Sequence, residues 1–462
     1  MKAKAVLIHL GCAKNLVDSE TIIPQLLTAG YEIADNTAMA ELIVVNTCGF
    51  LESAVEEAIQ TILEVAQYKH TGACQTLLVI GCMVQRYGRK LLSLLPEVNL
   101  FAGTSHYHRV REILREHQSG NQQRLWIARP EHLQTSDHPR QRSTPSHTAY
   151  LKIAEGCSNH CTFCFIPKLR GPYRSRSMAD VVQEAKRMAA EGVREVNVIA
   201  QDITGFATDR GEIAGLERLL EALETIQGLD WIRLLYAYPG RISSRLLQVM
   251  AHSGKIVPYL DFPIQHCVPH LLRAMHRGAH QCDMESLIGQ IRAEVPGIAL
   301  RTSIMVGFPG ETEDDFEVLL TFVERMRFEH LGVFAYSPEE GTAAARFPQQ
   351  VSDEVKICRY ERLLNLQRNI SRQRLDRLCG SVVPVLVEGF HPETELLLCG
   401  RMPTQAPEVD GMVLINRGTG TPGTIMPVMI TDAQDYDLIG ELIEEAPASP
   451  QSGRHKGGVA EL

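Results

Sequence analysis

The stretch Tyr150-Leu-Lys-Ile-Ala-Glu-Gly-Cys157-Ser-Asn-His-Cys161-Thr-Phe-Cys164 runs from a short apolar segment directly into three closely spaced cysteines. Three thiolates at this C-x-x-x-C-x-x-C spacing can hold three irons of a 4Fe–4S cube and leave the fourth iron open. A structural zinc site usually takes four protein ligands, but no fourth cysteine follows nearby, and His160 would be a strained substitute. The apolar segment predicts a strand that carries this site at its carboxyl end.

Further apolar runs follow at spacings that leave room for helices between them. Together they predict six strands in series: Tyr150–Ala154, Glu195–Ala200, Trp231–Ala237, Tyr259–Ile264, Ala299–Val306 and His330–Ala335. Helical patterns lie between the strands, for example over Ala179–Glu191 and Glu313–Arg325, and a long helix over Ser352–Leu378 closes the region. Repeated strand–helix units predict a parallel sheet, either open or curled into a barrel.

The beginning of the chain predicts a smaller α/β unit. Its expected elements are the strands Lys4–Leu10, Leu42–Asn46 and Thr76–Ile80 and the helices Ser19–Ala29, Ser53–Gln67 and Lys90–Leu95. A cysteine follows each strand, namely Cys12, Cys48 and Cys82, and each has a glycine beside it. Because the carboxyl ends of parallel strands share one edge, these thiols are expected to converge and could hold a second cluster with an open iron. Three buried structural cysteines are the alternative.

The C-terminal region differs in composition from the rest of the chain. Residues 382–442 contain short runs of Val, Ile, Leu and Thr broken by Gly and Pro, which predicts about five strands of a small all-β barrel. The polar residues 121–148 predict a linker, and residues 446–462 predict a disordered tail. The expected folded domains therefore cover residues 1–120, 149–378 and 379–445.

The cysteine run after the first strand of the central domain resembles the radical S-adenosylmethionine superfamily, and Phe163 before the last cysteine fits its pattern. The resemblance implies that a cluster cleaves S-adenosylmethionine reductively to a 5′-deoxyadenosyl radical, which abstracts hydrogen from an unactivated carbon. It also implies that Gln201, after the second strand, contacts the cofactor. The stretch Val306-Gly-Phe-Pro-Gly-Glu311 resembles the glycine motif of the superfamily, with a plain tight turn as the alternative. The cofactor contacts implied there are Gly307, Pro309 and Gly310.

The three-domain layout is similar to that of the methylthiotransferases, with an N-terminal three-cysteine domain, a partial radical barrel of six strand–helix units and a TRAM-like barrel. The resemblance implies two 4Fe–4S clusters, of which the one at Cys12, Cys48 and Cys82 donates sulfur. One molecule of S-adenosylmethionine supplies a methyl group and another supplies the radical. A low-potential electron donor such as flavodoxin or ferredoxin is implied as a partner.

Two motifs favour one branch of these enzymes. The stretch Leu10-Gly-Cys-Ala-Lys-Asn-Leu-Val-Asp-Ser-Glu20 is similar to the RimO-like branch, which modifies an aspartate β-carbon on the basic small-subunit ribosomal protein S twelve. The MiaB-like branch modifies a base in transfer RNA and typically has Met-Asn in this motif. The stretch Ile166-Pro-Lys-Leu-Arg-Gly-Pro-Tyr-Arg-Ser-Arg176 also looks RimO-like. Its arginines, Arg170, Arg174 and Arg176, could hold a substrate carboxylate or line the cofactor pocket.

The distribution of charge gives independent evidence on the substrate. The formal net charge is −9, and residues 380–445 alone hold two arginines, no lysine and eleven acidic side chains, so the excess lies in this one domain. A barrel that binds RNA should be basic, because phosphate contacts dominate affinity. This domain is expected to attract a basic protein instead, and direct RNA binding is not expected. A solvated acidic surface with no partner is the alternative.

Two further expectations concern the class and the compartment of the protein. A non-catalytic electron-transfer protein with two clusters is a weaker alternative, because electron carriers usually saturate the irons with four protein ligands. Twelve cysteines are compatible with a reducing compartment, and no apolar run approaches the ~18–20 residues of a membrane span. The beginning of the chain lacks the features of a signal peptide, so we expect a cytoplasmic protein.

Overall fold

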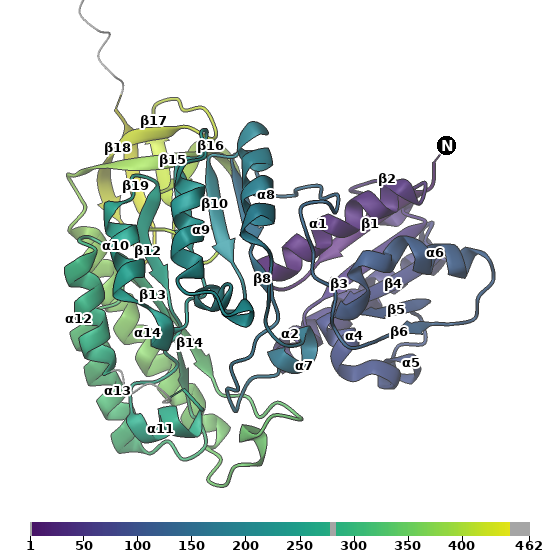
Figure 1. The fold of residues 1–462 in the computed structure, drawn as a ribbon, viewed down its shortest axis with the longest axis horizontal. Helices are drawn as coiled ribbons and strands as arrows, with labels where there is room; N and C mark the ends of the chain where they lie inside the picture. The colour runs from purple at the N-terminus through teal and green to yellow at the C-terminus, as the bar shows by residue number, and fades with distance from the viewer. Residues whose placement is uncertain (1, 278–282, 444–462) are drawn as a thin grey trace, which may run out of the picture.

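The computed structural model describes residues 2–277 and 283–443, and the tail predicted over 446–462 lies outside this range. Figure 1 shows an N-terminal α/β unit on the right, a larger curved sheet with its helices on the left, and a small C-terminal barrel at the top. These three parts confirm the predicted fold class. No described helix is both long and apolar enough to cross a membrane.

The N-terminal unit is a six-stranded parallel sheet with helices on both faces. Its strands are β1 (Lys4–His9), β2 (Glu32–Ile33), β3 (Leu42–Thr47), β4 (Thr76–Gly81), β5 (Leu100–Gly103) and β6 (Leu125–Trp126), in the order β2-β1-β3-β4-β5-β6. Its helices are α1 (Ala13–Thr28), α2 (Glu52–Ala66), α3 (Tyr68–Thr71), α4 (Cys82–Tyr87), α5 (Leu91–Leu94) and α6 (Val110–Gln118). Leu42 of β3 packs on the side of α1 and α6, and Ile43 packs on the side of α2. This burial of both faces explains the continuous apolar runs.

The structure extends this unit beyond the sequence prediction. Strands β2, β5 and β6 were not predicted, because they are too short for a periodic signal, and β6 falls inside the segment expected to be a linker. Helix α1 begins at Ala13 rather than at Ser19. Its first turns carry Asn15 and Asp18, which are polar yet only 2% and 4% exposed, so the hydrophobic pattern hides the beginning of the helix.

The central domain is a second parallel sheet of six strands. They are β7 (Thr148–Lys152), β10 (Glu195–Ile199), β11 (Trp231–Leu234), β12 (Ile256–Asp261), β13 (Ala299–Val306) and β14 (His330–Ala335), in the order β14-β13-β12-β11-β10-β7. The helices are α7 (Ile166–Arg170), α8 (Met178–Ala190), α9 (Gly215–Glu224), α10 (Ser244–His252), α11 (Pro269–Ala274), α12 (Met284–Glu294), α13 (Glu313–Met326) and α14 (Asp353–Asp376). All six expected strands are present, and β13 and β14 have the predicted bounds.

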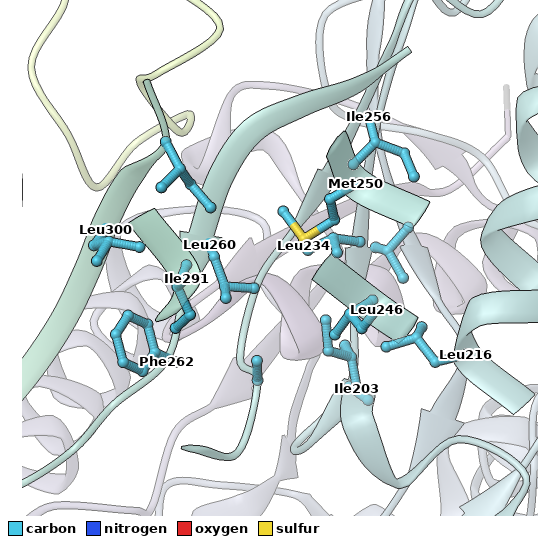
Figure 2. Packing of buried hydrophobic residues seen from close by; sticks show 14 of the residues in the cluster. Ile203, Leu216, Leu234, Leu246, Met250, Ile256, Leu260, Phe262, Ile291 and Leu300 are labelled. Atoms are coloured by element: carbon cyan, nitrogen blue, oxygen red, sulfur yellow. The ribbon is translucent and has the colours of Figure 1, made fainter. Parts of the chain in front are cut away.

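The two faces of the central sheet are buried by different partners. One face packs against the helices, and Figure 2 shows Leu234 and Leu260 from the strands meeting Leu246 of α10 and Ile291 of α12. The opposite face carries larger aromatic side chains, including Tyr259, and helices α8 to α14 do not contribute to the cluster on that side. Strands β7 and β14 are at the two ends of the order and do not pair among the described residues, so the sheet is a partial barrel.

The C-terminal domain is a closed five-stranded barrel of β15 (Val382–His391), β16 (Thr394–Arg401), β17 (Val413–Arg417), β18 (Ile425–Ala433) and β19 (Leu438–Leu442). It packs on the amino ends of the central strands, where Arg401 binds Glu195 and His330 donates from Nε2 to the Thr404 carbonyl at 2.8 Å. Leu386 of β15 joins Tyr259 in the cluster on the inner face. The C-terminal barrel therefore closes the end of the central barrel that lies opposite to the carboxyl ends of its strands.

Candidate functional site

The first three cysteines lie in neighbouring loops at one edge of the N-terminal sheet. Cys12 caps the beginning of α1 after β1, Cys48 follows β3, and Cys82 begins α4 directly after β4. A Cβ atom on Gly11 would lie 2.9 Å from the Cβ of Cys48, and one on Gly49 would lie 2.7 Å from the carbonyl carbon of Cys82. The loops approach so closely that only glycine fits at these two positions. The structure thus places the three cysteine-bearing loops against one another at one edge of the sheet, and their role as ligands of one cluster stays a prediction.

Positive charge surrounds these thiols. Cys12 reaches solvent, but desolvation by the surrounding chain would by itself raise its pKa. The Lys14 ammonium and the Arg170 guanidinium outweigh that effect, so the pKa of Cys12 lies below its usual range. Burial raises the pKa of Cys82 to about 12, although Arg170 acts in the opposite direction. Burial also raises the pKa of Cys48, again against Arg170. Arg170 therefore favours the thiolate at all three positions, and the thiolate is the form that binds metal.

The second three cysteines lie in the loop after the short strand β8 (Ala154–Glu155), which pairs with β9 (Arg174–Ser175). A Cβ atom on Gly156 would lie 2.2 Å from the Pro172 carbonyl oxygen, so the loop can turn here only with glycine. The Asn159 amide donates to the Cys157 sulfur at 3.4 Å. Burial raises the pKa of Cys157 to about 11 and that of Cys164 to about 12. The side chain of His160 is exposed.

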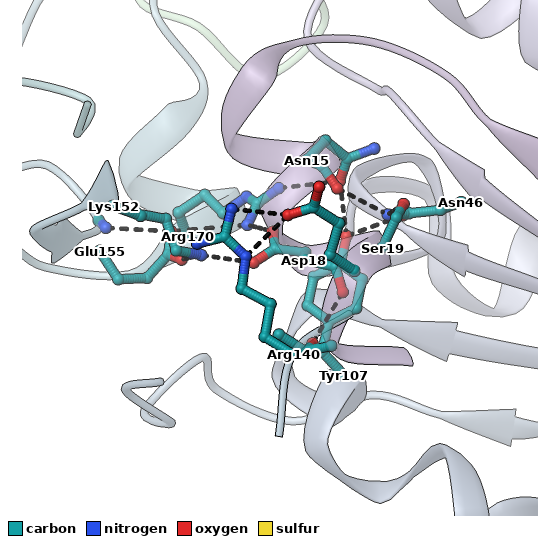
Figure 3. Close-up of polar contacts among 12 residues, drawn as sticks. Asn15, Asp18, Ser19, Asn46, Tyr107, Arg140, Lys152, Glu155 and Arg170 are labelled. Carbon is teal, nitrogen blue, oxygen red and sulfur yellow. Dashed lines mark hydrogen bonds and ion pairs between the residues drawn. The ribbon is translucent and has the colours of Figure 1, made fainter. Parts of the chain in front are cut away.

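Figure 3 shows a network of buried ion pairs that joins α1, which begins directly after Cys12, to β7 and α7, which lie before and after the second cysteine set. Arg170 of α7 and Lys152 of β7 both bind the Asp18 carboxylate of α1. They also share Glu155, at 2.8 Å from Lys152 and 3.5 Å from Arg170. Asn15 accepts from Arg170 at 3.1 Å. The sequence analysis missed this network, because Asp18 and Arg170 are 152 residues apart in the chain.

The ion-pair network predicts a large effect of Asp18 on stability. In Asp18→Asn, Lys152 and Arg170 keep Glu155 as their only carboxylate, and breaking a buried pair costs about 3–5 kcal/mol. We expect the free energy of unfolding to fall by this amount in urea titrations followed by circular dichroism. The control is Glu112→Gln, which removes the exposed pair with Arg109 and should cost less than about 1 kcal/mol. Equal midpoints for both variants would contradict the structural role of Asp18.

The three arginines that the sequence analysis considers for a substrate carboxylate or for the cofactor pocket differ in their contacts. Arg170 is held by Asp18 and Glu155, and Arg176 binds Asp180 at 2.7 Å and Glu184 at 2.5 Å. The third, Arg174, donates to the carbonyls of Pro172 and Arg170 at 2.9 and 3.1 Å. Arg170 and Arg176 are thus paired with carboxylates of the chain itself, whereas Arg174 meets only backbone carbonyls among the described residues, and sequence proximity to the cysteines could not reveal this difference.

Gln201 and Phe163 lie where a cofactor at the second cysteine set would meet them. Gln201 follows β10 and donates to Glu155 at 3.0 Å, while its Oε1 atom is buried without a hydrogen-bond partner among the described residues. This acceptor fits a ligand that carries an N–H donor, such as the amino group of S-adenosylmethionine. Phe163 is half-buried and packs beside Phe308. Both placements are compatible with the implied contacts.

The glycine motif after β13 is organised mainly by the chain itself. The Glu311 carboxylate accepts from the amides of Gly307 and Phe308 at 2.6 and 3.1 Å. Gly307 has φ +73°, and a Cβ atom there would lie 2.3 Å from Cγ of Lys356 in α14. Gly310 has φ +86°, and Pro309 is buried. Packing against Lys356 therefore explains Gly307 at least as well as close approach to a ligand.

Comparison with known protein families divides the chain into three matched segments. Residues 4–103 match "Uncharacterized protein family UPF0004", residues 151–323 match "Radical SAM superfamily", and residues 379–443 match "TRAM domain". Among solved structures, the radical S-adenosylmethionine methyltransferase TsrM from Kitasatospora setae, with cobalamin and a [4Fe-4S] cluster bound, is similar with a TM-score of 0.58. The match covers 83% of this chain and 81% of that chain at 14% identity, so it supports the fold alone.

Curated relatives match over nearly the full length. The "Ribosomal protein uS12 methylthiotransferase RimO" of Syntrophobacter fumaroxidans is 56% identical over 439 residues, which cover 95% of this chain and 98% of the relative. Proteins of the same name from Geotalea uraniireducens and Geobacter sulfurreducens are 47% and 48% identical, and each match covers 96% of this chain and 99% of the relative. The chain belongs to the RimO family of ribosomal protein uS12 methylthiotransferases.

Proposed function

We propose that this chain transfers a methylthio group to the β-carbon of an aspartate in ribosomal protein uS12. S-adenosylmethionine is both the radical source and the methyl donor, and Cys12, Cys48 and Cys82 hold the cluster that donates sulfur. Full-length similarity to the RimO proteins supports this activity. The observation that carries the assignment within the molecule is the presence of two separate sets of three cysteines, joined by one buried network that contains Arg170.

The residues fit two clusters, each held by three thiolates. When bound, the clusters supply the electron that cleaves S-adenosylmethionine and the sulfur that is transferred. Around Cys12 the chain contributes positive charge from Lys14 and Arg170, and at Cys157 it contributes the Asn159 N–H. We assign these groups the role of offsetting the negative charge of the three thiolates at each site. Gly307, Pro309, Gly310, Phe163 and Gln201 remain proposed contacts of the cofactor.

The C-terminal barrel supports a basic protein partner, and its position refines that argument. Only one of its two arginines adds positive charge to its surface. Arg401 is 2% exposed and bound to Glu195, whereas Arg417 is exposed. The barrel lies at the amino ends of the central strands, away from the six cysteines. We therefore assign it to attracting and holding the body of a basic substrate. Methylthiolation of transfer RNA, the MiaB-type alternative, is not favoured.

Three further points belong to the same proposal. A flavodoxin or ferredoxin would supply the low-potential electron. The cytoplasm, where thiols remain reduced, suits both the cysteines and a ribosomal substrate. The division into three domains remains our proposal. The first domain, expected over residues 1–120, is extended through Trp126 because β6 pairs with β5, and the other two keep the bounds 149–378 and 379–445.

Mass spectrometry of two candidate substrates tests the proposal. Purified, cluster-reconstituted protein is incubated with a reductant and S-adenosylmethionine, together with either uS12 or unmodified transfer RNA. We expect a methylthio group on one aspartate of uS12 and no change in the RNA. Modification of the RNA without modification of uS12 would refute the proposed substrate.

A further inference from the structure

Lys14 reaches from the N-terminal unit into the mouth of the central barrel. It lies in the first turn of α1, two residues after Cys12, and its Nζ atom is 3.1 Å from the centroid of the Tyr236 ring. Tyr236 follows β11 and has φ +67°, which is unusual for a residue with a side chain. Its amide donates to Asp261 at 3.2 Å. The backbone of the central barrel thus fixes the ring on which the ammonium of Lys14 rests.

The segment around Tyr236 extends from one cysteine set to the other. At its first residue, Cys12 and Lys14 both affect the pKa of Tyr236, so all three groups are close together. Two residues later, the Tyr238 amide donates to the Thr204 hydroxyl at 3.2 Å, and the Asp202 carboxylate accepts both from Thr204 and from Asn159 of the second cysteine loop. Lys14 therefore lies in the region between the two cysteine sets, which we call the seam.

The charge of Lys14 has no carboxylate partner. The other two cations buried at this seam, Lys152 and Arg170, are both bound to Asp18. Among the described residues, no carboxylate oxygen lies within 4.0 Å of the Lys14 ammonium, the limit that defines an ion pair here. Lys14 is half-buried and the neighbouring Cys12 is exposed, so the ammonium borders on accessible space. A partly desolvated cation that has no carboxylate within ion-pair distance among the described residues, and that borders on open space, is a suitable site for an incoming carboxylate.

We propose that Lys14 binds the side-chain carboxylate of the aspartate that is modified, a role that rests on the proposed function. The β-carbon of aspartate is bonded directly to the carboxylate carbon. An ion pair between the carboxylate and Lys14 would therefore fix the β-carbon at the seam between the two cysteine sets. Asparagine presents no negative charge there, so Lys14 would also select aspartate over asparagine. Lys14 is thus both a positioning residue and a determinant of specificity.

One other cation near the cysteines provides a matched control. Arg277 lies over the Tyr238 ring, with its guanidinium carbon 5.0 Å from the ring centroid, and donates to the Pro263 carbonyl at 2.5 Å. It resembles Lys14 in resting on an aromatic side chain after β11. Arg241 is less suitable as a control, because it already pairs with Asp202.

A double-mutant cycle between enzyme and substrate tests the assignment. The cluster-loaded holoenzyme and its variants Lys14→Met, Lys14→Arg and Arg277→Met are titrated with uS12 carrying either aspartate or asparagine at the modified position. For the wild type we expect a Kd about tenfold or more lower for the aspartate form, as a charge-assisted contact would give. Lys14→Met should lose this preference, Lys14→Arg should retain part of it, and Arg277→Met should keep it.

Several outcomes would overturn the role of Lys14. Equal weakening of both substrate forms in Lys14→Met would mean a structural role, and unchanged binding of both would mean no contact. Loss of about half the iron from Lys14→Met would show that Lys14 supports Cys12 instead. A lost preference in Arg277→Met, with a retained one in Lys14→Met, would transfer the role to Arg277. Each of these differs from failure of the proposed function, in which the wild type would not modify uS12 at all.

Discussion

Replacing Cys157, Cys161 and Cys164 together with alanine is expected to abolish reductive cleavage of S-adenosylmethionine. These thiols lie in one loop whose path requires Gly156, and the side chain of His160 between them is exposed. Formation of 5′-deoxyadenosine should fall to the level seen without protein. The iron content should fall by about half, because one of two clusters is lost. Chromatography of the nucleoside and a colorimetric iron assay measure the two quantities.

Cys267 is the matched control for this variant. It follows the fourth strand of the same barrel and is half-buried, but it packs with the apolar cluster around Phe308 rather than in the cysteine loop. Cys267→Ala should keep both the iron content and cofactor cleavage. If the triple variant still cleaved the cofactor at the wild-type rate, the assignment of the radical site would be wrong.

Replacing Cys12, Cys48 and Cys82 with alanine should produce the complementary result. The iron content should again fall by about half, but 5′-deoxyadenosine should still form, because the second loop remains complete. Transfer of the methylthio group to uS12 should cease, since its sulfur source is lost. The expected phenotype is thus a protein that consumes S-adenosylmethionine without modifying its substrate, and mass spectrometry of uS12 together with nucleoside analysis detects it.

The matched control for the second variant is Cys74→Ala. Cys74 belongs to the same N-terminal unit and is buried, but its thiol donates to the Thr76 carbonyl at 3.6 Å, away from the loops of Cys12 and Cys48. This variant should keep the full iron content and the full transfer activity. Wild-type iron content in the triple variant would refute the second cluster.

The sequence predicted the six cysteines as two sets because each signal is local. The three barrel cysteines are close together in the chain, and each of the other three follows an apolar strand, so sheet geometry alone brings them together. The six central strands were also predicted from a local signal, because each is a short apolar run. In contrast, β2 and β6 have two residues each and leave no periodic pattern.

Contacts between domains could not be predicted in the same way. Arg170 and Asp18 are 152 residues apart in the chain, and nothing in either local pattern indicates that they meet. The arginines were therefore interpreted as groups that could hold a substrate carboxylate or line the cofactor pocket, whereas the fold pairs Arg170 and Arg176 with its own carboxylates. Likewise, the acidic composition of the C-terminal barrel was visible in the sequence, but its position at the amino ends of the central strands was not.

The buried position of Arg170 has a consequence for the biogenesis of the protein. A chain leaves the ribosome from its amino end, and domains generally fold as units in that order. Cys12, Cys48 and Cys82 emerge first, yet Arg170, the cation that favours the thiolate at all three positions, belongs to α7 and emerges after them. The N-terminal unit can therefore form its sheet during translation, but its metal site reaches its final electrostatic state only after the central domain has begun to dock. Iron loading of the site that is synthesised first thus becomes a late step in maturation.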